Sequence, residues 1–168
     1  MTPQPMKAIT KDSKTIVFMH EQKGIGKLYY TGFFSHKAGI LDSENQAYTI
    51  HSLDFWRRSF EVSANGKAVI AFTKKWNGNA LVKTLSGSGE NEYIFRHKGF
   101  LNSRYVLQDR DDREMAVVRA RFEWKRFRRD FDITINDSLK QQPRYFLLVA
   151  LAVFLTRDLI RQHAAGGV

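Results

Sequence analysis

A short stretch in the last third of the chain holds the densest group of cations that could do chemistry. It contains Arg119, Arg121, Lys125, Arg126, Arg128 and Arg129. Guanidinium groups that converge on one point can clamp a phosphate through paired hydrogen bonds. Glu123, Asp130 and Asp132 are interspersed, so a solvated face with partly cancelling charges is the alternative. The stretch therefore supplies candidate anion-binding residues, with that alternative left open.

Two further segments place aromatic side chains beside cations. They are Trp56-Arg57-Arg58 and Lys74-Lys75-Trp76. An amphipathic aromatic ring next to a cation suits a contact at the level of lipid headgroups, or a stacked nucleic-acid base. The same composition is also common at the solvated edge of a barrel. Lys74 and Lys75 join the candidate anion-binding residues.

Acidic and glycine-rich motifs favour turns over ligand sites. Asp109, Asp111, Asp112 and Glu114 lack the glycine and the distal bidentate Glu of a calcium loop, so we predict a hairpin turn. The segment Gly24-Ile25-Gly26-Lys27 lacks the full spacing of a phosphate loop, and we predict a turn there too.

No constellation indicates catalysis. The five histidines have no metal-ligand spacing, and they are His20, His36, His51, His97 and His163. No nucleophile elbow occurs. The absence of Cys excludes disulfides, thiolate zinc sites, iron–sulfur clusters and a Cys nucleophile. We expect a non-enzymatic protein without a metal or another cofactor.

Composition and charge narrow the class of protein. A chain of 168 residues with 43% hydrophobic residues fits one globular domain, residues 1–168. The net charge of +10 favours anionic partners, although a basic surface without a ligand is the alternative. The segment Met1 to Phe18 has no apolar core of a secretory signal. We expect a cytoplasmic protein, with peripheral membrane association left open.

The elements that must position these residues are mostly short strands. We predict ten of them: Lys14–His20, Lys27–Phe34, Gln46–Leu53, Phe55–Val62, Lys67–Lys74, Leu81–Leu85, Glu92–His97, Ser103–Leu107, Glu114–Trp124 and Phe131–Ile135. Asn65-Gly66 and Asn77-Gly78 suit type I′ hairpin turns, which need positive φ at both central residues. Further breaks are expected at Gly24–Gly26, Gly87-Ser88-Gly89 and Asp111-Asp112-Arg113. Regular spacing of this kind is typical of an antiparallel sandwich or barrel.

The strand Glu114–Trp124 has a clear two-residue period. Its expected core face carries Ala116, Val118, Ala120, Phe122 and Trp124. Its expected wet face carries Arg119, Arg121, Glu123 and Lys125. This alternation indicates a sheet with one face buried and one face in water.

A C-terminal helix over about residues 143–163 is predicted to form the core. Pro143 suits a first helical position, Arg161 and His163 suit the last turns, and Gly166-Gly167 would end the helix. Tyr145–Leu155 is apolar on every side but would rise only about 16 Å, against about 30 Å for a bilayer core. A helix that is apolar all round must be enclosed, so the strands are expected to close around it. A membrane-inserted tail is the alternative.

This order of elements resembles the tubby C-terminal-like superfamily, which includes tubby-like proteins, LURP-one-related proteins and phospholipid scramblases. The resemblance rests on the segments 113–119, 127–135 and 145–155, and covers about Glu92–His163. Earlier strands match by pattern only. It implies a closed antiparallel barrel of about twelve strands around a hydrophobic C-terminal helix.

What the resemblance implies for function is less specific. Tubby-like members bind phosphoinositides through basic residues, whereas LURP-one-related proteins have no agreed activity. The segment Arg157–Arg161 is too poor in acids for the calcium segment of scramblases. We expect a binding module for anionic phospholipid or phosphoinositide headgroups. The alternative is an intracellular scaffold for protein partners, and nucleic acid is a weaker candidate partner.

Overall fold

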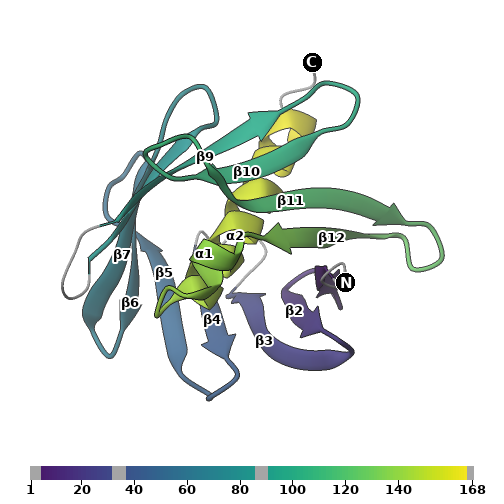
Figure 1. The fold of residues 1–168 in the computed structure, drawn as a ribbon, viewed down its shortest axis with the longest axis horizontal. Coiled ribbons are helices and arrows are strands. Elements are labelled where there is room, and N and C mark those ends of the chain that lie inside the picture. Colours follow the sequence, from purple (N-terminus) through teal and green to yellow (C-terminus); the bar gives the residue numbers. More distant parts are fainter. Residues whose placement is uncertain (1–4, 32–36, 86–90, 166–168) are drawn as a thin grey trace.

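Twelve strands and two helices make up the computed structural model, which describes residues 5–31, 37–85 and 91–165 (Figure 1). The strands are β1 Met6–Thr10, β2 Thr15–His20, β3 Lys23–Tyr30, β4 Ala38–Asp42, β5 Ala47–Ser52, β6 Ser59–Ala64, β7 Lys67–Lys74, β8 Ala80–Thr84, β9 Glu92–Lys98, β10 Arg104–Gln108, β11 Glu114–Glu123 and β12 Arg128–Ile135. The helices are α1 Asp137–Lys140 and α2 Tyr145–Ala165.

The strands form one closed, up-and-down antiparallel barrel. Each strand pairs with its neighbours in the sequence, and β1 pairs with β12 to close the ring, with Met6 opposite Ile133. Closure leaves no open sheet edge. The structure therefore confirms the predicted fold class, a closed antiparallel barrel of twelve strands with a C-terminal helix.

Helix α2 fills the barrel, as the uniformly apolar segment predicted. Figure 1 shows it running through the middle of the strands. Every side chain from Leu147 to Thr156 is buried, and the Thr156 hydroxyl donates to the Ala152 carbonyl oxygen at 2.7 Å. Enclosure on all sides explains why the stretch Leu147–Leu155 of this helix has no polar face. In the described ranges 5–31, 37–85 and 91–165, no helix has both the length and the apolar run that crossing a membrane requires.

The start of the helical region differs from the prediction. The segment after β12 forms the short helix α1, whose N-cap Asn136 accepts a hydrogen bond from the Ser138 N–H at 2.8 Å. Pro143 lies outside both helices, and α2 begins at Tyr145. Gly166-Gly167, the expected end of the helix, lies outside the described residues.

Two strands, β1 and β4, were not predicted. Met6 and Ala8 of β1 are buried, but Lys7 between them and the lysines that follow make the segment polar overall. The five residues of β4 include Gly39, which weakens the strand pattern. Each of the two strands is hydrogen-bonded to a neighbour on both sides, which its own short sequence does not reveal.

The turn predicted at Gly24–Gly26 is wrong, because both glycines lie inside β3. The chain reverses instead at Glu21 and Gln22, whose φ angles are 50° and 67°. Gly26 allows the helix to approach the sheet, since a Cβ there would lie 2.4 Å from Cζ of Phe146.

The remaining turn predictions have mixed outcomes. Asn65-Gly66 takes positive φ at both positions, as predicted. At Asn77-Gly78, the other predicted type I′ turn, only Gly78 has a positive φ. A three-residue loop takes the place of the type I′ turn there. The hairpin turn at Asp111-Asp112-Arg113 is confirmed, with the Asp109 carboxylate accepting the Arg113 N–H at 2.9 Å. The break predicted at Gly87-Ser88-Gly89 lies outside the described residues.

The alternation predicted for β11 holds only where the strand lines the barrel. Ala116 and Val118 are buried, Ala120 and Phe122 are half-buried, and Trp124 lies beyond the strand with 77% of its surface exposed. Placing Trp124 in the core was therefore wrong. The β11–β12 hairpin extends past the barrel wall at this point (Figure 1). A side chain here can therefore lie on the same face of the strand as Ala116 and Val118 without being buried.

Candidate functional site

Up-and-down connectivity sorts the strand connections into two sets, one at each end of the barrel. Connections that follow odd-numbered strands lie at one end, and those that follow even-numbered strands lie at the other. We call the first the aromatic end; its described connections are residues 11–14, 31, 37, 53–58, 75–79, 99–103 and 124–127. We call the second the opposite end; its described connections are residues 21–22, 43–46, 65–66, 85, 91 and 109–113.

Exposed apolar side chains gather at the aromatic end. Its described connections carry eight exposed large hydrophobic residues: Leu53, Phe55, Trp56, Trp76, Phe100, Leu101, Trp124 and Phe127. Among the described residues, the opposite end has only Leu85, which is 38% exposed, whereas Phe100 is 95% exposed. Exposed patches of this kind on one side of a molecule mark interaction surfaces.

Charge is divided between the ends in the same way. The described connections of the aromatic end carry Lys11, Lys14, Lys37, Arg57, Arg58, Lys75, Lys125 and Arg126 against Asp12 and Asp54. Those of the opposite end carry Glu21, Glu44, Asp109, Asp111 and Asp112 against Arg110 and Arg113. The aromatic end therefore presents a positive potential to its surroundings.

The C-terminal half of α2 reaches the aromatic end and contributes to three pockets there, one of which is lined by Ile160 and His163 together with Arg119 and Arg129. The His163 ring lies 6.1 Å from that of His97 near the end of β9. Leu155, Leu159 and Gln162 recur at helical spacing and line one pocket. Arg157, Ile160 and Arg161 lie on the opposite side of the helix and line another.

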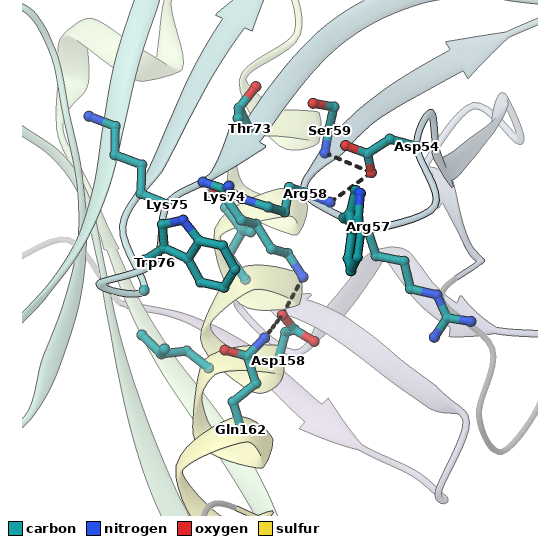
Figure 2. Close-up of a pocket in the computed structure, with 14 residues that line it drawn as sticks. Asp54, Arg57, Arg58, Ser59, Thr73, Lys74, Lys75, Trp76, Asp158 and Gln162 are labelled. Carbon is teal, nitrogen blue, oxygen red and sulfur yellow. Dashed lines mark hydrogen bonds and ion pairs between the residues drawn. The ribbon is translucent and has the colours of Figure 1, made fainter.

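The first of these, the tryptophan pocket, has a volume of about 830 Å³ and lies between the β5–β6 and β7–β8 connections (Figure 2). Trp56 and Trp76 form part of its walls, and Leu155 and Leu159 form part of its apolar lining. The β7–β8 turn contacts the helix closely here, since a Cβ on Gly78 would lie 2.7 Å from Cδ1 of Leu159.

The cations that face into the tryptophan pocket already have partners. The Lys74 ammonium is paired with the Asp158 carboxylate of α2 and lies 4.8 Å from the centre of the Phe60 ring. The Arg58 guanidinium stacks over Trp76 at 4.4 Å, and its Nε donates to the Lys74 carbonyl oxygen at 3.3 Å. In Figure 2, Arg57 and Lys75 instead point away from the pocket on opposite sides. The interior therefore suits an apolar group, with Arg57 and Lys75 available outside it.

Asp54 organises the β5–β6 connection around this pocket. Its Oδ1 accepts the backbone N–H of Arg58 at 2.9 Å, and the Ser52 hydroxyl donates to its carbonyl oxygen at 2.8 Å. The hydrogen bond from the Arg58 N–H holds the pKa of Asp54 below its usual value. The predicted strand Phe55–Val62 is present as β6, but its predicted start is wrong for this reason: residues 53–58 form a turn, with Arg57 at a φ of 56°, and β6 begins at Ser59.

The second pocket, the arginine pocket, has a volume of about 580 Å³ and lies where β12 and α2 meet the β1–β2 connection. Four arginines line it: Arg128, Arg129, Arg157 and Arg161. Asp12 is the one carboxylate in its described lining. Partial desolvation, and then the charge of the neighbouring Arg157, lower the pKa of Arg161 from its ordinary value. The arrangement has a surplus of positive charge.

The structure spreads the six cations of segment 119–129 over several places, although Arg119 and Arg129 line one pocket together. Arg119 and Arg121 lie exposed on β11, and Arg121 Nε contacts Asp132 Oδ2 at 3.3 Å. Arg126 Nη2 contacts Asp130 Oδ2 at 2.5 Å. Lys125 is exposed at the tip of the hairpin. Arg128 and Arg129 line the arginine pocket, while Lys74 and Lys75 lie at the tryptophan pocket.

Sequence reasoning missed both the tryptophan pocket and the arginine pocket, although the sequence held a signal for one of them. Segments 56–58 and 74–76 bracket the hairpin β6–β7, whose Asn65-Gly66 turn was predicted. The outer ends of a hairpin must meet, so the two tryptophans could have been placed side by side. Arg157 and Arg161 gave no comparable signal, because their partners come from β12 and from the β1–β2 connection.

In the part of the chain that the structure describes, no three His, Cys, Asp or Glu side chains are grouped so that they could hold a metal ion. Comparison of the chain with models of protein families, with curated proteins and with solved structures gave no match. The molecule is thus defined by its own geometry: a closed barrel filled by its C-terminal helix, with aromatic side chains and cations concentrated at one end.

Proposed function

We propose that the protein is a non-enzymatic module that binds anionic phospholipid membranes peripherally through its aromatic end. The observation that carries this proposal is the concentration of exposed aromatic side chains and net positive charge on the same set of connections. Neither feature alone would support a membrane contact, because scattered exposed apolar residues and a basic surface are both ordinary.

The two features match the two layers of a membrane surface. Indole rings of Trp favour the headgroup region, and Phe and Leu side chains gain free energy when they leave water. Each Lys or Arg close to an anionic leaflet contributes about 1 kcal/mol. The cations stand beside the aromatics, as with Arg57 beside Trp56 and Lys125 beside Trp124. A single docking orientation therefore satisfies both layers.

A protein partner is the alternative function, and one feature favours the membrane over it. The exposed aromatics lie in four separate strand connections, between β5 and β6, β7 and β8, β9 and β10, and β11 and β12. Separate tips can each enter a fluid interface without matching a rigid surface. A partner protein would have to fit all of them together, as interface cores are packed with high shape complementarity.

Co-sedimentation with vesicles tests the proposal. We expect the protein to sediment with vesicles of phosphatidylcholine and phosphatidylserine at low salt, and less at moderate salt as screening weakens the attraction. Vesicles of phosphatidylcholine alone should retain little protein. Failure to bind the anionic vesicles at low salt would overturn the proposal, and a saturable protein partner in its absence would favour the scaffold alternative.

We also propose that the chain is a divergent member of the tubby C-terminal-like superfamily. Two features support this: a closed twelve-stranded antiparallel barrel, and a buried helix placed last in the chain. This kinship would make lipid binding more plausible, but the proposal for function rests on the aromatic end and does not depend on it.

A further inference from the structure

The lining of the arginine pocket holds more positive charge than its one carboxylate can offset. Arg128, Arg129, Arg157 and Arg161 make no ion pair with a carboxylate in the described parts of the chain. Asp12, the one acid in the lining, accepts the Lys14 backbone N–H at 2.7 Å. Four guanidinium groups against one carboxylate repel one another in a site that is partly shielded from water.

Arg157 is the arginine of this pocket whose guanidinium lacks a hydrogen-bond partner at one nitrogen. Its Nη2 donates to the Ser13 carbonyl oxygen at 2.6 Å, and its guanidinium lies 4.0 Å from the centre of the Tyr30 ring. These contacts fix the side chain, yet Nη1 is buried without a hydrogen-bond partner. A buried charged donor without a partner carries a large desolvation cost, and a small shift of the Arg157 side chain would let Nη1 donate to an acceptor in the pocket.

Arg161 lies next to Arg157 and shares its aromatic neighbour. Its guanidinium is 6.0 Å from the same Tyr30 ring. The spacing of four residues places Arg157 and Arg161 on the same side of α2, where their like charges repel each other. Arg128 and Arg129 approach from β12, so cations from two elements line a single cavity.

We propose that the arginine pocket binds a phosphate group, with preference for a phosphomonoester over a phosphodiester. A monoester carries about −1.5 to −2 charges near neutral pH and three free oxygens, whereas a diester carries about −1. The monoester therefore neutralises more of the surplus charge and offers more acceptors to the guanidinium groups. Inorganic phosphate shares this chemistry.

The proposal rests on the proposed membrane function and deepens it. Phe127, at the tip of the β11–β12 hairpin, also lines the arginine pocket, so a docked aromatic end would place the pocket at headgroup level. Phosphatidic acid is the membrane lipid whose headgroup is a simple phosphomonoester. A soluble phosphate compound is the other source, and the test separates the two.

The test combines inorganic phosphate with two kinds of vesicle. Isothermal titration should detect phosphate binding to the wild-type protein, and phosphate should raise its thermal stability. Sedimentation compares vesicles of phosphatidic acid with vesicles of phosphatidylglycerol, a phosphodiester, matched for surface charge. We expect phosphatidic acid to bind the protein at least about tenfold more tightly, because each additional charged hydrogen bond is worth about tenfold.

The variant pair R129Q/R161Q removes two cations from the pocket, and R110Q/R113Q removes the same charge at the opposite end. Arg129 and Arg161 are both exposed enough for the barrel to fold without them, which thermal unfolding checks. We expect the first pair to abolish phosphate binding and the preference for phosphatidic acid, and the second pair to leave both intact.

Three outcomes separate this inference from the proposed function. If anionic vesicles bind without preference and phosphate does not bind, the inference is overturned while the membrane function stands. If phosphate binds and R129Q/R161Q abolishes it but no vesicle binds, the phosphate site is supported with a soluble source and the membrane function fails. If R129Q/R161Q binds phosphate as the wild type does, the pocket is not the site.

Discussion

The two ends of this barrel share one set of strands and one helix, yet their surfaces differ in almost every respect. The described connections of the aromatic end carry Trp, Phe and surplus cations. Those of the opposite end are mostly polar and rich in Asp, Glu and Asn. Strand composition cannot produce this difference, because every strand runs from one end to the other. The connections therefore carry the functional information, and the strands and α2 hold them in place.

This comparison depends first on the core that both ends share. Ala152→Asp should place an unpaired carboxylate in the middle of the barrel, since Ala152 is 1% exposed. We expect a loss of at least about 4 kcal/mol of unfolding free energy, enough to leave the chain unfolded. Ala164→Asp, the same change at an exposed position of the same helix, should cost little. Circular dichroism and thermal melts compare the two, and an equally stable Ala152→Asp variant would contradict the account of the core.

Replacing exposed apolar side chains should give the largest difference between the two ends in membrane binding. Phe55→Ser with Phe100→Ser removes two side chains that are about nine-tenths exposed, so folding should be unaffected. Loss of their burial in the interface should weaken binding to anionic vesicles by about 100-fold. Leu85→Ser at the opposite end is the control and should bind like the wild type. Equal effects at both ends would show that the ends do not differ in function.

Removing cations from the aromatic end should also weaken vesicle binding more than removing them from the opposite end, but by less than the loss of apolar side chains does. Arg57→Gln with Lys75→Gln lowers the net charge by two at the aromatic end, and Arg110→Gln with Arg113→Gln does so at the opposite end. We expect the first pair to weaken vesicle binding about 30-fold at low salt and the second to have little effect. If both pairs weaken binding equally, attraction depends on total charge and not on one end.

Two turn glycines, one at each end, should give the smallest difference, which is a difference in unfolding free energy. Gly66 and Gly78 both have positive φ, 77° and 87°, but a Cβ meets nothing at Gly66 and lies 2.7 Å from Leu159 Cδ1 at Gly78. Gly66→Ala should cost about 1 kcal/mol of unfolding free energy from the backbone alone. Gly78→Ala should cost about 1 kcal/mol more, because Leu159 must shift. Chemical denaturation measures both, and equal costs would mean that the turn does not press on α2.

The sequence predicted the parts of this molecule in which local pattern and burial agree. The apolar stretch Tyr145–Leu155 and the long strands β7 and β11 were found because each has a strong pattern of its own. The strand β1 was missed because its stability comes from pairing with β2 and β12. Trp124 was misplaced because the two-residue period continues past the barrel wall, where parity no longer implies burial.

The candidate site was less predictable, since it depends on which connections meet in space. The predicted patch of six cations is split by its own acids, as with Arg121 beside Asp132 and Arg126 beside Asp130. The arginine pocket instead joins Arg129 to Arg157, 28 positions further along the chain, across the interface between β12 and α2. Only closure of the barrel around the helix determines that juxtaposition.

Intrinsic tryptophan fluorescence in the presence of vesicles tests the docking of the aromatic end most directly. The chain has three tryptophans, Trp56, Trp76 and Trp124, and all three are exposed at that end. Adding vesicles that contain anionic lipid should shift the emission to shorter wavelength, and lipids brominated near the headgroup should quench it. Binding to such vesicles with neither a shift nor quenching would mean that another face of the barrel meets the membrane.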